Sequence, residues 1–467
     1  MMHKTGFRRK MKNKIRKFAP RFLISWYHFF WALAGAFVFG FPGKRIKVIG
    51  VTGTNGKTTT IELISAVLKQ AGYKVAILSS IKFQIGDEQE ENKLRMTMPG
   101  RARVQRFLKQ AVEAKCDYGI LEITSEGIVQ HRHRFIDFEV AVLTNLSPEH
   151  IESHGSFTNY RATKLKFFND VKNIHILNLD DENFKYFNQF KPARKYFYGF
   201  GKAGGGPSST SLVGQGSSLP DLAPGFVAAE NIQVSSSGIK FFVNNQEFNL
   251  NLLGEFNVYN ALAAICVGLS QGVDFKVCKE ALEKVQGIAG RMEMVIKEPF
   301  KVFVDYAFTP NALEQVYKSI RDNWLKGRMI CVLGACGGGR DKWKRPVLGG
   351  LAGKYCQRIV VTNEDPYDED PNQILLEIKS GILNESPVLS DSPSQGEPSD
   401  RQTIDVILGR REAIGKALAM AEIGDVVVIT GKGCEPSICL AGGEKMPWDD
   451  RRVVREEFEK IRSEKIK

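Results

Sequence analysis

The chain has 467 residues, of which 43% are hydrophobic and 25% are charged. This length is too great for a single hydrophobic core, so we expect two or three domains, and the composition excludes a largely disordered or fibrous protein. The net charge of +13 is concentrated at the start of the chain, because nine Lys or Arg residues fall within residues 1–21 and the first acidic residue is Glu62. This basic arm suits an anionic lipid or RNA, or is a solubilising tail. The remainder is close to neutral, and we expect no nucleic-acid partner.

Residues 22–41 are apolar apart from Ser25 and His28, and are long enough to cross a bilayer. A crossing with the basic arm inside would put the phosphate-binding loop described below outside the cell. We therefore favour a helix in the membrane plane or a hydrophobic hairpin, with residues 1–43 touching an anionic membrane at its inner face. A helix packed on the protein's own body and a true span are the alternatives. Eight cysteines without C-x-x-C spacing argue against a zinc ribbon and favour reduced thiols in the cytoplasm.

After this segment, strands are predicted at 46–52, 75–79, 118–123 and 140–146, with a helix at about 58–71 and further helical patterns between the others. This alternation predicts an α/β fold with a parallel, doubly wound sheet. A second α/β alternation begins at Phe300. Residues 201–224 and 385–402 are rich in Gly, Ser and Pro and are interpreted as surface insertions. We expect three parts: an N-terminal segment (1–43), a central α/β domain (44–287) and a C-terminal Rossmann-like domain (288–467).

The strongest motif is VTGTNGKTTT at 51–60, between a predicted strand and a helix. This is the setting of a phosphate-binding loop, in which Gly53 and Gly56 let backbone N–H groups surround a phosphate. Lys57 supplies charge to the β- and γ-phosphates, the Thr58 hydroxyl suits Mg²⁺, and the helix N-terminus adds its dipole. The spacing is the short G-x-x-G-K-T form, and the candidate ATP-binding residues of the loop are Gly53, Thr54, Asn55, Gly56, Lys57, Thr58 and Thr59.

Two further side chains follow the ends of predicted strands. Glu122 ends one strand and His150 follows the next, so both are expected to reach Mg²⁺ bound to ATP. Without its surrounding motif, His150 would be interpreted as a surface histidine. In isolation Lys164 and Lys166 would likewise indicate a solvated helix face.

The short loop resembles that of the Mur ligase and folylpolyglutamate synthase superfamily, and the resemblance continues in order over residues 46–460. It is closest to the MurE type. The blocks that carry it are LEITSEGIVQHR (121–132), TNLSPEHIESHG (144–155), YRATKLKFF (160–168), GEFNVYNALAA (254–264), GRME (290–293), VDYAFTP (304–310), GGGRDKWKRP (337–346) and GKGCE (431–435).

The resemblance implies an ATP- and Mg²⁺-dependent ligase that forms an acyl phosphate and then an amide. It implies metal binding by Thr58, Glu122, His150 and a carbamylated Lys164, and catalytic roles for Lys57, Glu122, His150 and Lys164. By the same resemblance, Asn257 and Asn260 lie near the adenine, while Arg291 and Asp305 close over the nucleotide. Contacts to the muramoyl-peptide substrate are implied for Thr97, Ser125, Gln130 and Arg132, and contacts to the incoming amino acid for Arg340, Gly431 and Glu435.

Several positions depart from the family. Its histidines are replaced by Glu126, Phe308 and Cys434, and its D-N-P-R motif, which reads meso-diaminopimelate, is E-D-P-Y and ends in Tyr367. A tyrosine cannot form the bidentate pair of an arginine with the distal carboxylate, so lysine, ornithine or another amino acid is favoured. MurE-type enzymes also carry a uridine-binding domain ahead of the loop, where this chain has a short basic and apolar segment.

The expected function is addition of the third amino acid to UDP-N-acetylmuramoyl-L-alanyl-D-glutamate in peptidoglycan synthesis, with that muramoyl-dipeptide and a free amino acid as partners. One alternative is another ligase of the superfamily with a different, for instance lipid-linked, acceptor. The other is a membrane-associated scaffold that has lost catalysis, which the three replaced histidines favour.

Overall fold

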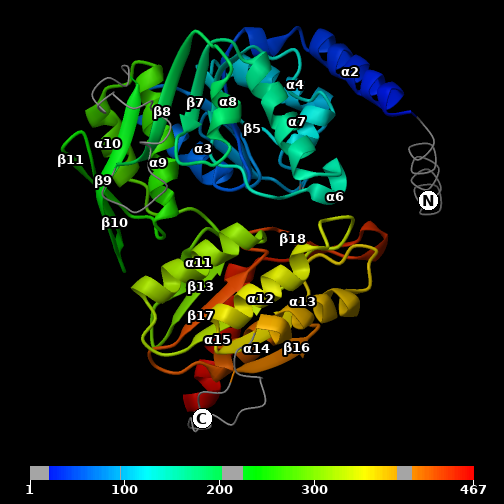
Figure 1. The fold of residues 1–467 in the computed structure, drawn as a ribbon, viewed down its shortest axis with the longest axis vertical. Coiled ribbons are helices and arrows are strands. Elements are labelled where there is room, and N and C mark those ends of the chain that lie inside the picture. The colour runs from blue at the N-terminus through cyan, green and yellow to red at the C-terminus, as the bar shows by residue number, and fades with distance from the viewer. Residues whose placement is uncertain (1–19, 95, 202–224, 386–401, 467) are drawn as a thin grey trace.

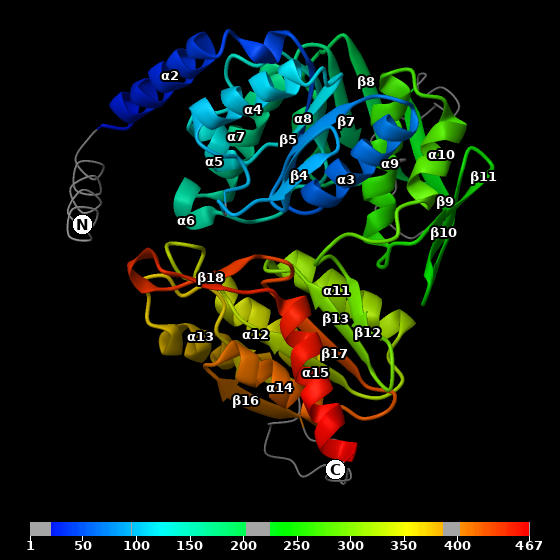
Figure 2. The same ribbon diagram turned by 180° about the vertical axis from the view of Figure 1, so that it is seen from behind.

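The computed structural model describes residues 20–94, 96–201, 225–385 and 402–466. Within them, two α/β bodies lie one above the other, with the described residues up to Glu283 in one and those from Glu293 in the other (Figures 1 and 2). Residues 1–19 of the basic arm and almost all of the two Gly/Ser/Pro-rich stretches lie outside the described residues. The predicted α/β class with largely parallel sheets is confirmed.

The central body is built on an 11-stranded sheet in the order β11-β10-β9-β8-β7-β6-β1-β5-β2-β3-β4. The strands from β9 to β2 pair in parallel, and an antiparallel pair extends the sheet at each edge. The strand bounds are β1 Lys47–Thr52, β2 Val75–Leu78, β3 Lys82–Ile85, β4 Glu88–Glu91, β5 Tyr118–Glu122, β6 Phe138–Leu143, β7 Ile174–Asn178, β8 Arg194–Phe200, β9 Phe226–Ser235, β10 Gly238–Val243 and β11 Gln246–Leu250.

Helices cover both faces of this sheet because its strands bury side chains on both sides. On β1, Ile49 and Val51 belong to one core while Val48 belongs to the other, as expected for the period of two residues in a strand. The first core includes helices α3 (Lys57–Gln70), α9 (Phe256–Ser270) and α10 (Phe275–Glu283). The second includes α4 (Arg101–Glu113), α5 (Ser125–Val129), α7 (Phe157–Asp170) and α8 (Phe184–Asn188).

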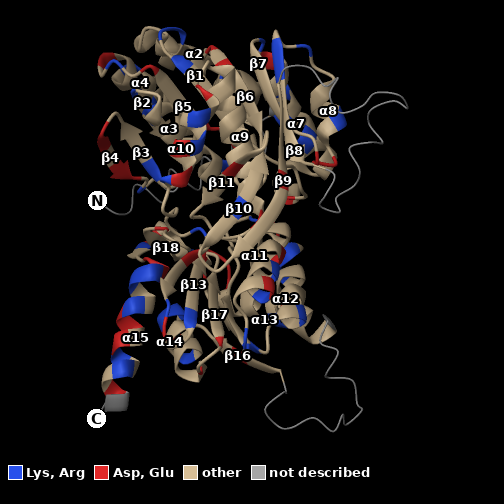
Figure 3. Cartoon of the chain, turned by 90° about the vertical axis from the view of Figure 1, so that its left-hand side faces the viewer, with Lys and Arg blue, Asp and Glu red and all other residues tan. Residues whose placement is uncertain are grey.

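The C-terminal body has a six-stranded sheet in the order β12-β13-β17-β14-β15-β16, in which only β12 runs antiparallel to its neighbour. Its strands are β12 Glu293–Ile296, β13 Lys301–Asp305, β14 Met329–Leu333, β15 Arg358–Thr362, β16 Thr403–Ile407 and β17 Val426–Thr430. Helices α11 (Pro310–Asn323), α12 (Lys344–Tyr355) and α13 (Pro371–Glu385) cover one face, and α14 (Arg410–Met420) and α15 (Asp450–Ile466) the other. Residues of both charge signs alternate along α15 (Figure 3), and a small hairpin of β18 (Ser437–Cys439) and β19 (Lys445–Pro447) follows β17.

Most of the apolar N-terminal segment forms a single helix, α2 (Arg21–Val38), so the predicted hairpin is wrong. This helix packs beside α4 on the outside of the central body, away from the C-terminal body (Figures 1 and 2). The structure thus agrees with one of the alternatives given above, in which this segment is a helix packed on the protein's own body. No helix in the described part of the chain has the length and apolar character needed to cross a membrane.

Candidate active site

The loop between β1 and α3 has the shape that the sequence predicts, and two of its positions accept only glycine. Gly53 has φ +150°, and a Cβ there would lie 1.9 Å from the Thr144 hydroxyl oxygen. Gly56 has φ +79°, and its Cβ would lie 2.4 Å from Oδ1 of Asn260. Both positions lie in a backbone region that side chains disfavour, so the loop can fold this tightly against its neighbours only with glycine.

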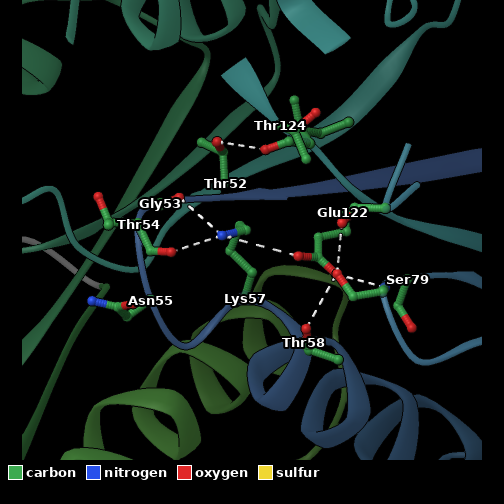
Figure 4. Close-up of polar contacts among 12 residues, drawn as sticks. Thr52, Gly53, Thr54, Asn55, Lys57, Thr58, Ser79, Glu122 and Thr124 are labelled. Atoms are coloured by element: carbon green, nitrogen blue, oxygen red, sulfur yellow. Dashed lines mark hydrogen bonds and ion pairs between the residues drawn. The ribbon is translucent and has the colours of Figure 1, made fainter. Parts of the chain in front are cut away.

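Two lysines converge on one carbonyl of this loop. Lys57 Nζ donates to the carbonyl oxygens of Gly53 (3.2 Å) and Thr54 (2.8 Å), as Figure 4 shows. Lys164 Nζ, on α7, donates to the same Gly53 oxygen at 2.9 Å and to Thr52 Oγ1 at 3.1 Å. Burial and the charge of Lys57 hold the pKa of Lys164 well below its usual value. This shift favours the neutral amine, which is the form that reacts with carbon dioxide.

Glu122, at the end of β5, is the central acceptor of the site (Figure 4). Its Oε2 accepts hydrogen bonds from Thr58 Oγ1 (3.2 Å) and from the Ser80 backbone N (2.9 Å) and Oγ (3.0 Å). Its Oε1 lies 4.0 Å from Lys57 Nζ. Ser80 in turn contacts the Thr97 hydroxyl at 2.7 Å. The carboxylate and the Thr58 hydroxyl place oxygen donors side by side, and oxygen donors are what Mg²⁺ prefers.

His150 follows β6 and precedes the short helix α6 (Ile151–His154), with a left-handed φ of 57°. Burial, together with the charges of Arg340, Lys164, Lys344 and Lys57, lowers the pKa of His150 to about 2. The imidazole is therefore neutral at physiological pH and keeps a lone pair for a ligand.

The short helix α6 that follows His150 is tied to the C-terminal body. Asp341 accepts hydrogen bonds from the backbone N–H groups of Ile151 (3.1 Å) and Glu152 (2.9 Å), and Lys342 N donates to Glu152 Oε1 at 2.6 Å. Glu149 and Lys344 form an ion pair of 3.1 Å that is almost fully buried. We call these contacts the inter-domain clasp.

Of the residues expected to contact the acceptor, Ser125, Gln130 and Arg132 lie on and after α5, whereas Thr97 precedes α4. Gln130 accepts from Arg132 Nη2 at 2.8 Å and donates to Glu126, and Arg132 also donates to the Met98 carbonyl oxygen. The Ser125 hydroxyl lies 3.1 Å from His154 Nε2. Glu126, at a position where the family has histidine, thus orients the glutamine that holds Arg132.

Helix α9 and the end of β8 line another part of the cavity that contains the phosphate-binding loop. Asn260 lines it and accepts from Thr60, whereas Asn257 donates to the Leu253 carbonyl oxygen and accepts from Asn260. Asn257 therefore positions Asn260 rather than lining the cavity. Phe200 and Tyr259 stack here with ring centroids 3.9 Å apart. The sequence analysis missed this aromatic pair because the two residues are far apart in the chain.

The C-terminal body contributes a second wall. Arg291 lies over the ring of Tyr306 (4.3 Å to the centroid), with Nη2 3.5 Å from Thr58 Oγ1. Asp305 accepts from the backbone N–H groups of Met292 and Ala307, and its burial raises its pKa. Thr309, the N-cap of α11, donates to Asn55 Oδ1 at 3.1 Å. The two bodies therefore meet directly over the phosphate-binding loop.

A third group of residues surrounds Gly431, after β17. Lys432 Nζ contacts Asp365 (3.0 Å) and Glu435 (2.6 Å), and the Tyr306 hydroxyl donates to Glu435 at 2.7 Å. Glu364 is 2% exposed, and its Oε2 has no hydrogen-bond partner among the described residues. Burial and Asp365 raise the Glu364 pKa. Here three carboxylates lie around one lysine.

One cavity of about 790 Å³ joins most of these groups. Fifteen predicted residues line it: Thr54, Asn55, Gly56, Lys57, Thr58, Thr59, Thr97, Glu122, Ser125, Arg132, His150, Asn260, Arg291, Asp305 and Arg340. Six do not: Gly53, Gln130, Lys164, Asn257, Gly431 and Glu435. The cavity also contains residues that the sequence analysis did not single out, among them Ser80, Asn145, Asp180, Tyr259 and Tyr306.

A strand, a short glycine loop with a lysine and a helix, set against oxygen donors and a second domain, define a nucleotide-binding enzyme of the P-loop class. The chain belongs to the Mur ligase family, whose members are ATP-dependent amide ligases: the family's middle domain matches residues 51–268, and its glutamate ligase domain matches residues 290–433. The resemblance found in the sequence is therefore confirmed.

Named relatives belong to the MurE type. The chain is 38% identical to a UDP-N-acetylmuramoyl-L-alanyl-D-glutamate–2,6-diaminopimelate ligase of Syntrophomonas wolfei, over 91% of this chain and 81% of that protein. It is 34% identical to a UDP-N-acetylmuramyl-tripeptide synthetase of a Roseiflexus species, over 91% and 80%. A solved UDP-N-acetylmuramoyl-L-alanyl-D-glutamate–2,6-diaminopimelate ligase is 27% identical, with a TM-score of 0.56 over 89% of this chain and 79% of that one.

Proposed function

We propose that this protein adds the third amino acid to UDP-N-acetylmuramoyl-L-alanyl-D-glutamate in peptidoglycan synthesis, using ATP in the cytoplasm. The observation that supports this most is the single cavity that the phosphate-binding loop, Arg132 and Arg340 all line. ATP, the acceptor's carboxylate and the incoming amine can thus meet at one place, and such positioning supplies much of the barrier lowering in a two-substrate reaction.

In the first step, a carboxylate oxygen of the acceptor attacks the γ-phosphorus of ATP, forming an acyl phosphate and releasing ADP. Lys57 and the N–H groups of the loop offset the phosphate charge, and Arg291, 3.5 Å from Thr58, approaches from the other body. Arg132 is expected to hold the acceptor, since its guanidinium suits phosphate or carboxylate groups.

Thr58, Glu122, His150 and a carbamylated Lys164 are proposed to hold Mg²⁺. The donor chemistry fits, because Thr58 and Glu122 offer adjacent oxygens, the imidazole is neutral, and the lowered pKa of Lys164 favours the amine form that adds to carbon dioxide. In carbamylation the amine nitrogen bonds to the carbon of carbon dioxide, one proton leaves, and a carbamate anion results. The ion would supply charge neutralisation to the phosphates.

In the second step, the amino group of the incoming amino acid attacks the acyl carbon, inorganic phosphate leaves and the amine loses a proton. Arg340 lines the cavity on the C-terminal side and is the proposed anchor for the α-carboxylate. Glu364, Asp365 and Glu435 are proposed to face the side chain of the amino acid. The acceptor and the incoming amino acid would thus be held by different bodies, which meet at the cavity.

The test is mass spectrometry of the product made from UDP-muramoyl-dipeptide, ATP and a panel of amino acids. A product heavier by one amino acid residue, formed together with ADP and phosphate, is expected. ATP hydrolysis that depends on a different acceptor would point to another ligase of the superfamily. Absence of any acceptor-dependent hydrolysis would support the scaffold alternative.

The amino acid is expected to be lysine, ornithine or another residue that carries no distal carboxylate. Tyr367 is half-buried, and its ring lies against Gly338, where a Cβ would approach Cδ2 to 2.6 Å. Arg345 does not replace the missing arginine, because its Nη1 and Nη2 are engaged by Glu377 (2.7 Å) and Glu369 (2.9 Å). The local excess of carboxylates attracts a terminal ammonium and repels a distal carboxylate.

Competition kinetics with lysine, ornithine and meso-diaminopimelate measure this preference. We expect kcat/KM for meso-diaminopimelate to be lower than that for lysine or ornithine. The difference should correspond to about 2–3 kcal/mol of transition-state stabilisation, the size of a hydrogen bond to a charged group. Tyr367→Arg should narrow the difference, whereas Tyr367→Phe, which restores no charge, should not. A wild-type preference for meso-diaminopimelate would contradict the prediction and would assign the clamp to Arg340.

A further inference from the structure

Helix α2 is attached to the protein by only one of its faces. The Ser25 hydroxyl lies 2.9 Å from His131 Nε2, and the Phe29 ring lies 5.3 Å from that of Phe135. A Cβ on Gly35 would come within 3.2 Å of the Ala102 backbone, so α2 and α4 pack closely. This inner face fixes the direction in which the opposite face points.

The outer face of α2 is apolar and aromatic although it is exposed. Trp26, Phe30 and Trp31 are 57%, 54% and 54% exposed. In the described chain, every exposed Phe, Tyr or Trp except Trp343 lies on this helix. Water-facing aromatic residues gathered in one stripe mark a contact surface. The full stripe consists of Phe22, Leu23, Trp26, Tyr27, Phe30, Trp31, Phe37 and Val38.

Positive charge flanks this stripe on several sides. In the sequence, eight Lys or Arg residues and no acidic residue precede α2, and Arg21 is its first residue. Arg103, Arg106 and Lys109 are exposed on the neighbouring helix α4, and Lys44 and Arg45 are exposed just after α2. A second copy of the chain would bring like charges together at this surface, whereas anionic headgroups would neutralise them.

We propose that the outer face of α2 lies in the plane of an anionic membrane surface, with its tryptophans at the headgroup level and the basic residues on the lipid phosphates. Trp and Tyr favour this boundary because each has an apolar body and a polar edge. An apolar helix face combined with basic flanks is the usual composition of such surface helices. His131, which contacts Ser25 of α2, lies between Gln130 and Arg132, so the docked helix would place these two residues, which are proposed to contact the acceptor, beside the membrane.

The test is co-sedimentation of the full-length protein with vesicles of phosphatidylcholine, with or without phosphatidylglycerol. We expect binding to the anionic vesicles that weakens with salt. Trp26→Glu/Phe30→Glu should lower partitioning at least about tenfold, because two large apolar side chains no longer enter the lipid. The matched control is Leu376→Glu/Ile423→Glu, at two positions 57% and 86% exposed on the C-terminal body, and it should bind like the wild type.

A second set of variants separates the charge from the apolar stripe. Arg8→Gln/Arg9→Gln/Lys10→Gln should lower binding to anionic vesicles roughly fivefold for each basic residue removed. An unchanged thermal midpoint and unchanged ATP turnover in all variants show that the fold persists. Binding by Trp26→Glu/Phe30→Glu equal to that of the wild type would overturn the proposal. A wild-type dimer that this variant converts to a monomer, without vesicle binding, would instead assign the stripe to a second copy.

Discussion

Lys57→Ala is expected to reduce turnover by roughly several hundredfold or more, the cost of about 3–4 kcal/mol for losing one preorganised group that stabilises developing charge. Lys57 Nζ is held by two loop carbonyl oxygens and lies 4.0 Å from Glu122. Its position is therefore set before a phosphate arrives, and alanine leaves no cation to replace it. The measurement is steady-state ADP release with saturating acceptor and amino acid.

Lys69→Ala is the matched control, because Lys69 lies on the same helix, is exposed and does not line the active-site cavity. It should keep wild-type turnover, and both variants should keep the wild-type thermal midpoint. Turnover of Lys57→Ala close to that of the wild type would remove the loop from the mechanism.

Lys164→Ala is expected to show a loss of about two orders of magnitude or more, and short carboxylic acids such as acetate should restore part of the activity. The loss is expected because the variant lacks the carbamate that offsets the charge of the metal. The expected size of the loss is that seen when one preorganised group that stabilises the transition state is removed. The rescue follows because a small carboxylate can occupy the space left by the side chain. A ¹³C NMR signal from labelled bicarbonate, present in wild type and missing in the variant, would report the carbamate independently of activity.

Lys166→Ala provides the comparison, since Lys166 is exposed two residues along α7. It should retain activity and the carbamate signal. Full activity of Lys164→Ala without additive would contradict the role of Lys164, and rescue of Lys166→Ala by acetate would show that the acid acts elsewhere.

The local parts of the site could be predicted from sequence because their functional residues are close together along the chain. The loop from Gly53 to Thr58 contains its glycines, lysine and hydroxyl in six positions, and Glu122 directly ends a strand. The alternation of strands and helices likewise predicted the α/β class. These features depend on residues that are neighbours in the sequence, so the local order of residue types is enough to predict them.

Contacts between distant segments could not be predicted in this way. Asp341 and Ile151 are 190 residues apart, and Phe200 stacks on Tyr259 only because β8 and α9 are neighbours in space. The sequence suggested Asn257 and Asn260 equally, yet only the side chain of Asn260 lines the cavity. For α2, an apolar run does not tell which face is covered by the protein; that depends on Gly35, which permits the approach of α4.

The inter-domain clasp ties together two proposed site residues that belong to different bodies. His150 lies between Glu149 and Ile151 in the central body, and Arg340 directly precedes Asp341 in the C-terminal body. The Glu149–Lys344 ion pair and the hydrogen bonds that Asp341 accepts therefore hold these two segments side by side. Since the spacing between His150 and Arg340 is set by contacts of their chain neighbours, a substitution in the clasp would change the proposed metal-binding and amino-acid-binding parts of the site together.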